Sequence, residues 1–332
     1  MELFQKYPIE VQLEVLAELI DKAKGTEFGK KYGFEDIRSY EDFAARVPVA
    51  PYEEMEPYIE RARLGEENVF WPTPIRWFAK SSGTTNAKSK FIPVSEESLE
   101  ERHYTAAKDL LCIYLNNHPD SQLFTGKGLR LGGSKQLYKE NGTAFGDLSA
   151  ILIDNMPLWA SISSTPNNRV SLMDDWETKL PAIVNDCIEE NVTSMAGVPS
   201  WMMVLLDKVL EKTGKKHLLE VYFHGGVSFE PYNEQYKKLL PSDDFRYYEI
   251  YNASEGFFAA QDQSHSKDLL LMLNYGIFYE FIPMQTFGTA HQKIIPLSEV
   301  ESGVNYAMVI SSNAGLWRYM IGDTERFTST RH

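Results

Sequence analysis

Hydrophobic residues recur every three or four positions in several stretches of this 332-residue chain, and this spacing predicts helices with one apolar face. The first stretch covers 9–24, and Gly25 follows its last turn as a stop signal. A second helix should begin at Tyr40, and Ser95 should cap a long helix that ends near Leu115. The remaining predicted helices cover 174–190, 201–212 and 229–240.

Short apolar runs lie between the later helices and predict buried strands. These strands are expected at 76–80, 129–131, 192–198, 219–224 and 245–251. Because strands and helices alternate, we expect an α/β fold with mixed sheets flanked by helices. Residues 48–75 contain five prolines and therefore predict only loops and short elements.

The pattern changes after Gly256, where helical spacing gives way to short apolar runs separated by turns. We read these runs as strands of an antiparallel β-rich subdomain. They are 257–260, 269–273, 277–282, 306–311, 316–321 and 326–329. The expected organisation is an α/β part at 1–255 and a β-rich subdomain at 256–332 of the same large domain.

The formal net charge of −14 argues against a nucleic-acid-binding face and against adhesion to anionic membranes. No apolar run is long enough to span a bilayer, and the first residues form an amphipathic helix pattern, not a secretory signal. Cys112 and Cys187 form no CxxC pair and lie within apolar helical patterns. We therefore expect two buried free thiols in a cytoplasmic protein.

Residues 80–90 place four hydroxyl side chains around one glycine, with one lysine before them and two lysines after. Hydroxyls and free backbone N–H groups donate hydrogen bonds, a glycine allows a tight turn around an anion, and lysines add positive charge. This composition indicates a loop that binds the phosphates of a nucleotide. It lacks the Gly-Lys-Ser/Thr ending of the common P-loop, and the same residue types also form ordinary surface turns.

Further polar residues follow predicted strands, at the carboxyl ends where α/β sheets bind ligands. Gly225 and Gly226 follow the strand at 219–224, the segment 251–256 ends the next strand, and Asp323 comes after a strand that contains Leu316 and Trp317. Together they offer a flat glycine surface, an aromatic ring and carboxylates, one of which could hold Mg²⁺. Each also has a structural alternative, since glycine pairs permit close packing and turn carboxylates are commonly solvated.

Two other features receive structural interpretations. The glycines at 126–133 are spaced one residue too widely for a dinucleotide fingerprint, so no Rossmann NAD site is expected there. His103 is a lone histidine on the predicted helix after Ser95, and such residues are usually structural.

The candidate stretches resemble the motifs of the Gretchen Hagen family of acyl acid–amido synthetases, an auxin-responsive family with bacterial relatives. The first motif matches 81–85 with 88–90, the second matches 251–256, and the third matches 317–323. Segments 47–53, 77–80 and 197–201 are also similar to the family. The likeness extends over essentially the whole chain. It implies the large N-terminal domain of an adenylate-forming enzyme.

The resemblance implies a two-step ligase reaction that uses ATP. A carboxylate attacks the α-phosphate to give an acyl-adenylate and pyrophosphate, and an amine, typically of an amino acid, then forms an amide and releases AMP. The catalytic residues implied are Ser81, Thr84 and Glu255, with Glu255 also holding Mg²⁺. The residues implied to bind the nucleotide are Ser81, Ser82, Gly83, Thr84 and Thr85 at the phosphates, Lys88, Gly225, Gly226, Ser254, Tyr251 stacked on adenine, and Asp323 at the ribose.

Members of this family continue past the third motif into a small C-terminal domain that delivers a lysine to the adenylate, whereas this sequence ends at His332. We therefore expect nucleotide binding with weak ligation. A carboxylate–CoA ligase and a non-catalytic nucleotide- or acid-binding module are the alternatives. An acid pocket is expected between the helix after Ser95 and the loop at 197–201, while the sequence identifies neither the acid, the amine nor the oligomeric state.

Overall fold

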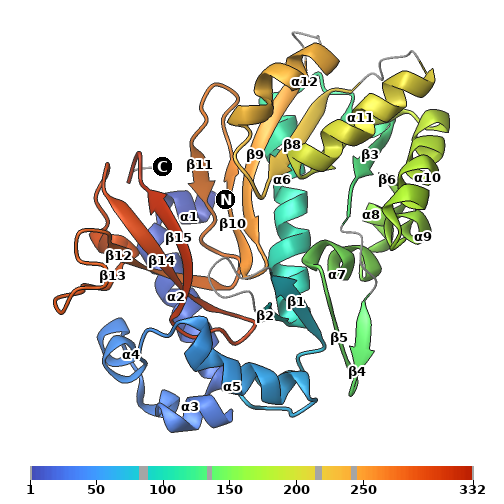
Figure 1. Cartoon of the computed structure of the whole chain (residues 1–332). Coiled ribbons are helices and arrows are strands. Elements are labelled where there is room, and N and C mark those ends of the chain that lie inside the picture. Colours follow the sequence, from blue (N-terminus) through green and yellow to red (C-terminus); the bar gives the residue numbers. More distant parts are fainter. Residues whose placement is uncertain (1, 82–88, 133–136, 214–218, 241–244, 331–332) are drawn as a thin grey trace.

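The computed structural model describes residues 2–81, 89–132, 137–213, 219–240 and 245–330 (Figure 1). Within these ranges the strands form one seven-stranded sheet and two four-stranded sheets. The α-helices are α1 (Glu2–Lys6), α2 (Pro8–Ala23), α3 (Glu27–Lys31), α4 (Tyr40–Arg46), α5 (Tyr52–Arg63), α6 (Thr105–Asn117), α7 (Leu148–Asp154), α8 (Leu158–Ile162), α9 (Asn168–Ser171), α10 (Trp176–Glu189), α11 (Pro199–Thr213) and α12 (Asn233–Leu239). The short 3-10 helices are η1 (Phe34–Asp36), η3 (Leu123–Thr125), η4 (Glu230–Tyr232) and η5 (Leu297–Glu299).

The seven-stranded sheet has the order β11-β10-β9-β8-β7-β3-β6. Its strands are β3 (Lys127–Arg130), β6 (Ser164–Thr165), β7 (Val192–Gly197), β8 (Val221–Gly225), β9 (Arg246–Ala253), β10 (Gly256–Gln261) and β11 (Leu269–Leu271). Strands β6, β3, β7, β8 and β9 run parallel, whereas β10 and β11 are antiparallel to their neighbours. Helices α10, α11 and α12 alternate with β7, β8 and β9 along the chain, so the predicted α/β fold is confirmed.

Helices cover both faces of this sheet, because successive side chains of a strand point to opposite sides. Tyr222 of β8 packs with the apolar residues of α10, α11 and α12. The next residue, Phe223, lies on the other face, where its ring is 5.8 Å from the ring of Tyr114 in α6. The predicted helix after Ser95 is confirmed as the π-helical segment η2 (Ser98–Tyr104) followed by α6, and the Ser95 hydroxyl accepts a hydrogen bond from the Ser98 N–H.

The second sheet has the order β2-β1-β5-β4. Its strands are β1 (Trp77–Ser81), β2 (Lys90–Val94), β4 (Tyr138–Glu140) and β5 (Thr143–Gly146). β1 forms an antiparallel hairpin with β2 and runs parallel to β5. Ser81 pairs with Lys90 at the end of the hairpin from which the connecting loop leaves.

The third sheet has the order β13-β12-β14-β15 and stands on the opposite side of the molecule from α10 (Figure 1). Its strands are β12 (Ile277–Pro283), β13 (Ile295–Pro296), β14 (Asn305–Ser312) and β15 (Tyr319–Arg326). The N-terminal helices pack on this sheet. The buried amide of Gln12 in α2 donates to the carbonyls of Leu273 and Ile277 at 2.8 and 2.9 Å, and its oxygen accepts from the Tyr279 N–H at 2.8 Å. The first long helix and the last sheet therefore share one core.

A buried ion pair joins α4, β12 and the start of β15. The Arg318 guanidinium donates to both carboxylate oxygens of Glu280 at 2.7 and 2.8 Å, and also to the carbonyls of Ala44 and Val47. The Tyr40 hydroxyl donates to the same carboxylate at 2.9 Å. Every nitrogen of the Arg318 guanidinium and both oxygens of the Glu280 carboxylate thus have a hydrogen-bond partner. Because its polar atoms are all bonded, the ion pair can be buried in a stable fold.

The prediction of loops and short elements for 48–75 is wrong in its middle, because α5 covers twelve of these residues. Pro51 occupies the N-cap, where no intrahelical N–H is needed, and only Pro57 lies inside the helix. Tyr52, Met55 and Ile59 recur at helical spacing and are buried. One apolar face in contact with the core outweighs one missing backbone hydrogen bond.

Three smaller expectations also need correction or comment. Cys112 is exposed on α6, so only Cys187 is a buried thiol. The strand predicted at 316–321 begins only at Tyr319 and continues to Arg326, and 327–329 are not strand residues. β10 and β11 extend the large sheet beyond residue 256, where the β-rich subdomain was expected to start, and the third sheet begins at Ile277.

Within the described ranges, no helix has both the length and the apolar character needed to cross a membrane.

Candidate functional site

The phosphate-loop candidate connects β1 to β2. Ser81 is the last residue of β1, and Lys90 opposite it is the first residue of β2. The other predicted phosphate-loop residues lie outside the described residues: Ser82, Gly83, Thr84, Thr85 and Lys88. The structure therefore gives the two ends of this loop.

Tyr251 and Asp323 come from different sheets and meet directly. The Tyr251 hydroxyl in β9 donates to Asp323 Oδ2 in β15 at 2.7 Å. Glu325, two positions further along β15, bonds the same hydroxyl, and burial raises the pKa of Glu325 to about 6. Burial and these carboxylates raise the pKa of Tyr251, so its hydroxyl stays protonated and donates. Asp323 was predicted to follow a strand that contains Leu316 and Trp317, but it lies inside β15.

Glu255 lies in the tight turn between β9 and β10, where Ala253 pairs with Gly256. Its side chain is buried, and burial raises the pKa of its carboxyl to about 7. Its own backbone N–H and the charge of Lys90 lower this pKa, while the charge of Asp323 raises it. Ser254 precedes it in the same turn. Glu255 is thus a buried carboxyl close to one cation and one anion.

Tyr319, the first residue of β15, contributes a buried hydroxyl to the same corner. Within the described part of the chain this hydroxyl has no hydrogen-bond partner. Besides burial, the neighbouring Glu255, Tyr52 and Asp323 act on its pKa, and all of them raise it. Tyr52 begins α5, and its hydroxyl accepts a hydrogen bond from the Phe91 N–H at 2.9 Å. Parts of α5, β2, β15 and the β9–β10 turn therefore converge here.

Gly225 and Gly226 end β8 next to this corner. Gly225 pairs with Ile250, the residue before Tyr251, and an added Cβ would lie 2.4 Å from the Ile250 carbonyl oxygen. Gly226 has a φ of +80°, which disfavours other residues. Preceding them, the His224 ring stacks on Phe229, and burial lowers its pKa to about 4. Close packing against Ile250 is enough to explain why position 225 is a glycine. That Gly225 or Gly226 contacts a nucleotide stays a prediction.

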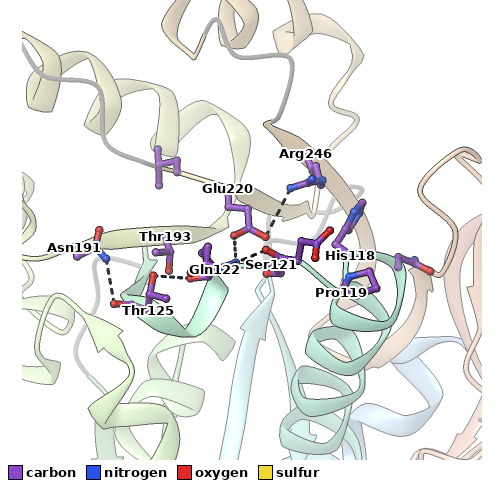
Figure 2. A pocket seen from close by; sticks show the side chains of 12 residues that line it. His118, Pro119, Ser121, Gln122, Thr125, Asn191, Thr193, Glu220 and Arg246 are labelled. Carbon is purple, nitrogen blue, oxygen red and sulfur yellow. Dashed lines mark hydrogen bonds and ion pairs between the residues drawn. The ribbon is translucent and has the colours of Figure 1, made fainter.

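A cavity of about 710 Å³ lies elsewhere, at the amino ends of β7, β8 and β9 (Figure 2). Figure 2 shows Glu220 and Arg246 side by side in its wall, 3.7 Å apart. Glu220 also accepts from the Tyr114 hydroxyl at 2.5 Å and from the Gln122 N–H at 2.7 Å. Because Glu220 directly precedes β8 and Gly225 ends it five positions later, Glu220 in the cavity wall lies roughly 16 Å from Gly225.

The structure thus brings the described candidates together at one corner, where Ser81 ends β1, Gly225 and Gly226 lie at the end of β8, Tyr251, Ser254 and Glu255 lie at the end of β9 and in the turn after it, and Asp323 lies inside β15. Sequence reasoning missed the contributions of Tyr319 and Glu325. Tyr319 lies four positions before Asp323 and Glu325 two positions after it, and this even spacing would have revealed them only if the strand had been placed at 319–326. His103, given a structural role, is buried, and burial lowers its pKa to about 3.

Comparison with solved structures defines the class as an adenylate-forming fold. The chain superposes on AtGH3.15 acyl acid amido synthetase in complex with 2,4-DB with a TM-score of 0.81 and 17% identity, covering 96% of this chain and 65% of that one. It superposes on 2-hydroxyisobutyryl-CoA ligase in complex with 2-HIB-AMP and CoA with a TM-score of 0.59 and 15% identity, covering 96% and 63%. These identities establish the fold alone.

Family models then identify the particular family. The model of the GH3 family N-terminal domain matches residues 1–245, and that of the GH3 family central domain matches residues 270–332. The chain therefore belongs to the GH3 family, as the three motifs predicted.

Curated relatives agree. Jasmonoyl–L-amino acid synthetase JAR4 of Nicotiana attenuata is 23% identical over 97% of this chain and 67% of its own length. Indole-3-acetic acid-amido synthetase GH3.3 of Arabidopsis thaliana is 23% identical over 96% and 64%. The chain thus spans about two thirds of the length of these relatives.

Proposed function

We propose that this chain forms the nucleotide-binding part of an AMP-forming ligase, which activates a carboxylic acid as an acyl-adenylate and conjugates it to an amine. The observation that carries the proposal is the meeting of Tyr251, Glu255 and Asp323 from the second and third motifs. Membership of the GH3 family supports it, since the relatives are named as synthetases that join an acid to an amino acid.

ATP would occupy the corner between the β1–β2 hairpin, β9 and β15. The loop from Ser81 to Lys90 would donate to its phosphates, with Ser81, Ser82, Thr84 and Thr85 as hydroxyl donors. Tyr251 would lie against adenine beside the glycine pair, and Asp323 would accept from the ribose hydroxyls. The bond from Tyr251 to Asp323 supports this arrangement, because it fixes the ring and the carboxylate relative to each other.

Glu255 is the residue we propose as a Mg²⁺ ligand. Among the described residues, no three His, Cys, Asp or Glu side chains cluster as a complete metal site. Mg²⁺ needs only one or two carboxylates when phosphate oxygens complete its shell. The buried carboxyl of Glu255 fits, because a nearby cation would compensate the burial that raises its pKa to about 7. When bound, the ion neutralises charge that develops on the phosphate oxygens.

We place the acid near the carboxyl ends of β7 and β8, beside the segment 197–201, which was predicted as a loop and forms the end of β7 and the start of α11. Three apolar side chains are exposed there, Val198, Trp201 and Val227. The end of β8 is adjacent to the junction of β7 and α11, since a Cβ on Gly226 would lie 3.6 Å from Val198 Cγ2. Exposed apolar groups beside a nucleotide site support an acid with an apolar body. The relatives' names mention indole-3-acetic acid and jasmonoyl groups, and an amino acid is our proposed acceptor.

The test is calorimetric titration of the chain with ATP, with and without Mg²⁺, for the wild type and Glu255→Ala. We expect Mg²⁺ to strengthen ATP binding by wild type, and the substitution to weaken binding on the order of tenfold only when Mg²⁺ is present, because it removes one ionic contact. Acid-dependent exchange of pyrophosphate into ATP would then establish adenylation.

Glu220→Gln is the matched control, since it alters a carboxylate at the other end of the same sheet, in the cavity of Figure 2. It should leave ATP affinity unchanged. Weaker binding in Glu220→Gln and not in Glu255→Ala would place the nucleotide in that cavity and overturn the proposal. Saturable binding without exchange for any acid would instead favour a non-catalytic binding module, and thioester formation with CoA would favour the CoA ligase alternative.

A further inference from the structure

Arg102 is a buried arginine that contacts the backbone of Glu255. It lies in the π-helical segment η2 and is only 1% exposed. Its Nη1 donates to the Glu255 carbonyl at 2.7 Å, its Nη2 donates to Asn313 Oδ1, and its Nε donates to the Tyr275 carbonyl at 3.4 Å. These three acceptors are neutral and come from three separate turns.

Burying a guanidinium among neutral acceptors is costly, because the charge loses water without gaining a carboxylate. Burial lowers the pKa of Arg102 to about 10. Arg318 shows the usual solution, since its guanidinium binds both oxygens of Glu280. The Arg102 guanidinium is a rigid fork that donates hydrogen bonds in three directions at once, which no neutral side chain can do. The geometry therefore indicates that Arg102 orders the turns it contacts.

The π-helical geometry supports this interpretation. Segments with this wider hydrogen-bonding pattern are rare, and they occur frequently at functional sites. In η2, five of the seven residues are buried, including Arg102, His103 and Tyr104. The segment thus directs polar side chains toward the protein interior. In an ordinary amphipathic helix this buried face would carry apolar side chains.

Asn313, the second acceptor, is itself held on all sides. Its Nδ2 donates to Glu101 Oε2 at 3.0 Å, its N–H donates to the Gly276 carbonyl at 2.9 Å, and its carbonyl accepts from the Ser95 hydroxyl at 2.7 Å. Arg102 therefore connects the Glu255 turn to a fixed point, and not to a freely moving side chain.

We propose that Arg102 is a positioning residue for metal–nucleotide binding, which holds the turn of Glu255 and thereby fixes where its buried carboxyl lies. This inference rests on the proposed function, because it assigns the Glu255 carboxyl to the metal. Arg102 itself touches neither the metal nor ATP. It acts on the backbone, and its loss should let the turn between β9 and β10 change position.

The experiment compares wild type with Arg102→Met, which keeps the length of the side chain and removes its donors, and Arg102→Lys, which keeps the charge and removes the fork. Gln12→Leu is the matched control. Gln12 also makes three buried hydrogen bonds, to Leu273, Ile277 and Tyr279, but does not contact the Glu255 turn. The readouts are ATP affinity with and without Mg²⁺, and amide hydrogen exchange of residues 250–258.

In both Arg102 variants we expect faster exchange of 250–258, unchanged metal-free ATP affinity, and loss of most of the gain in affinity that Mg²⁺ gives wild type. Gln12→Leu should unfold at a lower denaturant concentration than wild type, yet keep the full gain in ATP affinity that Mg²⁺ gives. If Arg102→Met does not fold, Arg102→Lys carries the test. A folded Arg102 variant with the full Mg²⁺ gain overturns the inference. A wild type that binds ATP without any Mg²⁺ gain overturns the proposed metal role of Glu255 instead, so the two failures are distinguishable.

Discussion

At the residue scale, Tyr319 is the group whose burial most needs a reason. A buried hydroxyl without a partner costs about 1–3 kcal/mol relative to a satisfied one. The Tyr319 hydroxyl has no partner among the described residues, and it lies close to the Glu255 carboxyl, which burial also disfavours. The Tyr319 hydroxyl and the Glu255 carboxyl are thus both buried at a cost in free energy. A ligand-binding site would contain such a pair if the bound ligand supplied the hydrogen bonds and the charge that they lack.

Substituting Tyr319→Phe tests this idea because it removes only the hydroxyl. We expect the ligand-free protein to become more stable by about 1 kcal/mol, since an unsatisfied donor is lost from the core. The stabilisation that Mg²⁺ and ATP confer should decrease at the same time. Chemical denaturation with and without the ligands measures both effects.

Tyr306→Phe is the control for this substitution. Tyr306 is equally buried in the same sheet, but its hydroxyl accepts a hydrogen bond from the Glu301 N–H at 2.8 Å. This variant should lose about 1 kcal/mol of stability and keep the ligand effect. A Tyr319→Phe protein that behaves like Tyr306→Phe in both respects would show that the Tyr319 hydroxyl is satisfied in solution.

The pKa of Glu255 makes a second prediction at this scale, concerning pH. Its carboxyl titrates at about 7 in the folded protein against an ordinary value of 4.5. Between these values the folded state binds more protons than the unfolded state, so stability contributed by this group is present at pH 4.5 and is lost as pH rises to 7. Each unit of difference corresponds to about 1.4 kcal/mol, so the total is a few kcal/mol at most.

Glu255→Gln removes this titration. We expect its stability relative to wild type to increase from pH 5 through pH 7 and to level off above about pH 8. Binding of Mg²⁺ and ATP should change in the opposite sense in wild type, weakening below pH 7 because the ion must displace a proton. Glu325, whose pKa is raised to about 6, titrates in both proteins and cancels in the comparison. Parallel stability curves for the two proteins would contradict the prediction.

At the scale of elements, hydrophobic spacing predicted the long segments well. The helices at 9–24, 174–190 and 201–212 and the strands between them were found within a few residues of their predicted bounds. Each of these elements buries one face, so the spacing of hydrophobic residues along its sequence matches the face that contacts the core. α5 was missed because proline content was given more weight than the apolar spacing of Tyr52, Met55 and Ile59.

Strand β15 shows a different limit of sequence reasoning. Its second half, from Gly322 to Arg326, is mostly exposed and polar, so it has no apolar pattern to reveal it. It is a strand because it pairs with β14, Asn305 opposite Arg326 and Tyr306 opposite Glu325. This tertiary pairing also places Asp323 and Glu325 on one side, next to Tyr251, which neither strand pattern alone could predict.

At the scale of the whole molecule, the candidate site exists only where three sheets meet. The motifs themselves named Tyr251, Glu255 and Asp323, but the groups that hold them come from distant parts of the chain. Arg102 reaches Glu255 across 153 positions and Asn313 across 211. Such contacts follow from how helices pack on sheets, and a single sequence does not specify them.

The ion pair of Arg318 and Glu280 allows a prediction at this scale, because it connects α4 near the N-terminus to β12 and β15 near the C-terminus. Glu280→Gln would leave the Arg318 charge buried without its carboxylate, and we expect a loss of about 3–5 kcal/mol in the free energy of unfolding. Combining Glu280→Leu with Arg318→Met should cost less than the sum of the single substitutions, since no charge is then stranded.

The exposed pair of Arg61 and Glu27, with an N–O distance of 2.6 Å, supplies the control for this comparison. Glu27→Gln should cost no more than about 1 kcal/mol, because water solvates the arginine that remains. Urea denaturation of the set measures the differences. If Glu280→Gln costs no more than Glu27→Gln, the buried pair does not hold the two ends of the chain together. The other outcome is that Glu280→Gln costs several times more than Glu27→Gln, while the combined Glu280→Leu and Arg318→Met variant recovers stability. The N-terminal helices and the sheet that carries Asp323 then unfold as one unit. The candidate site then depends on both.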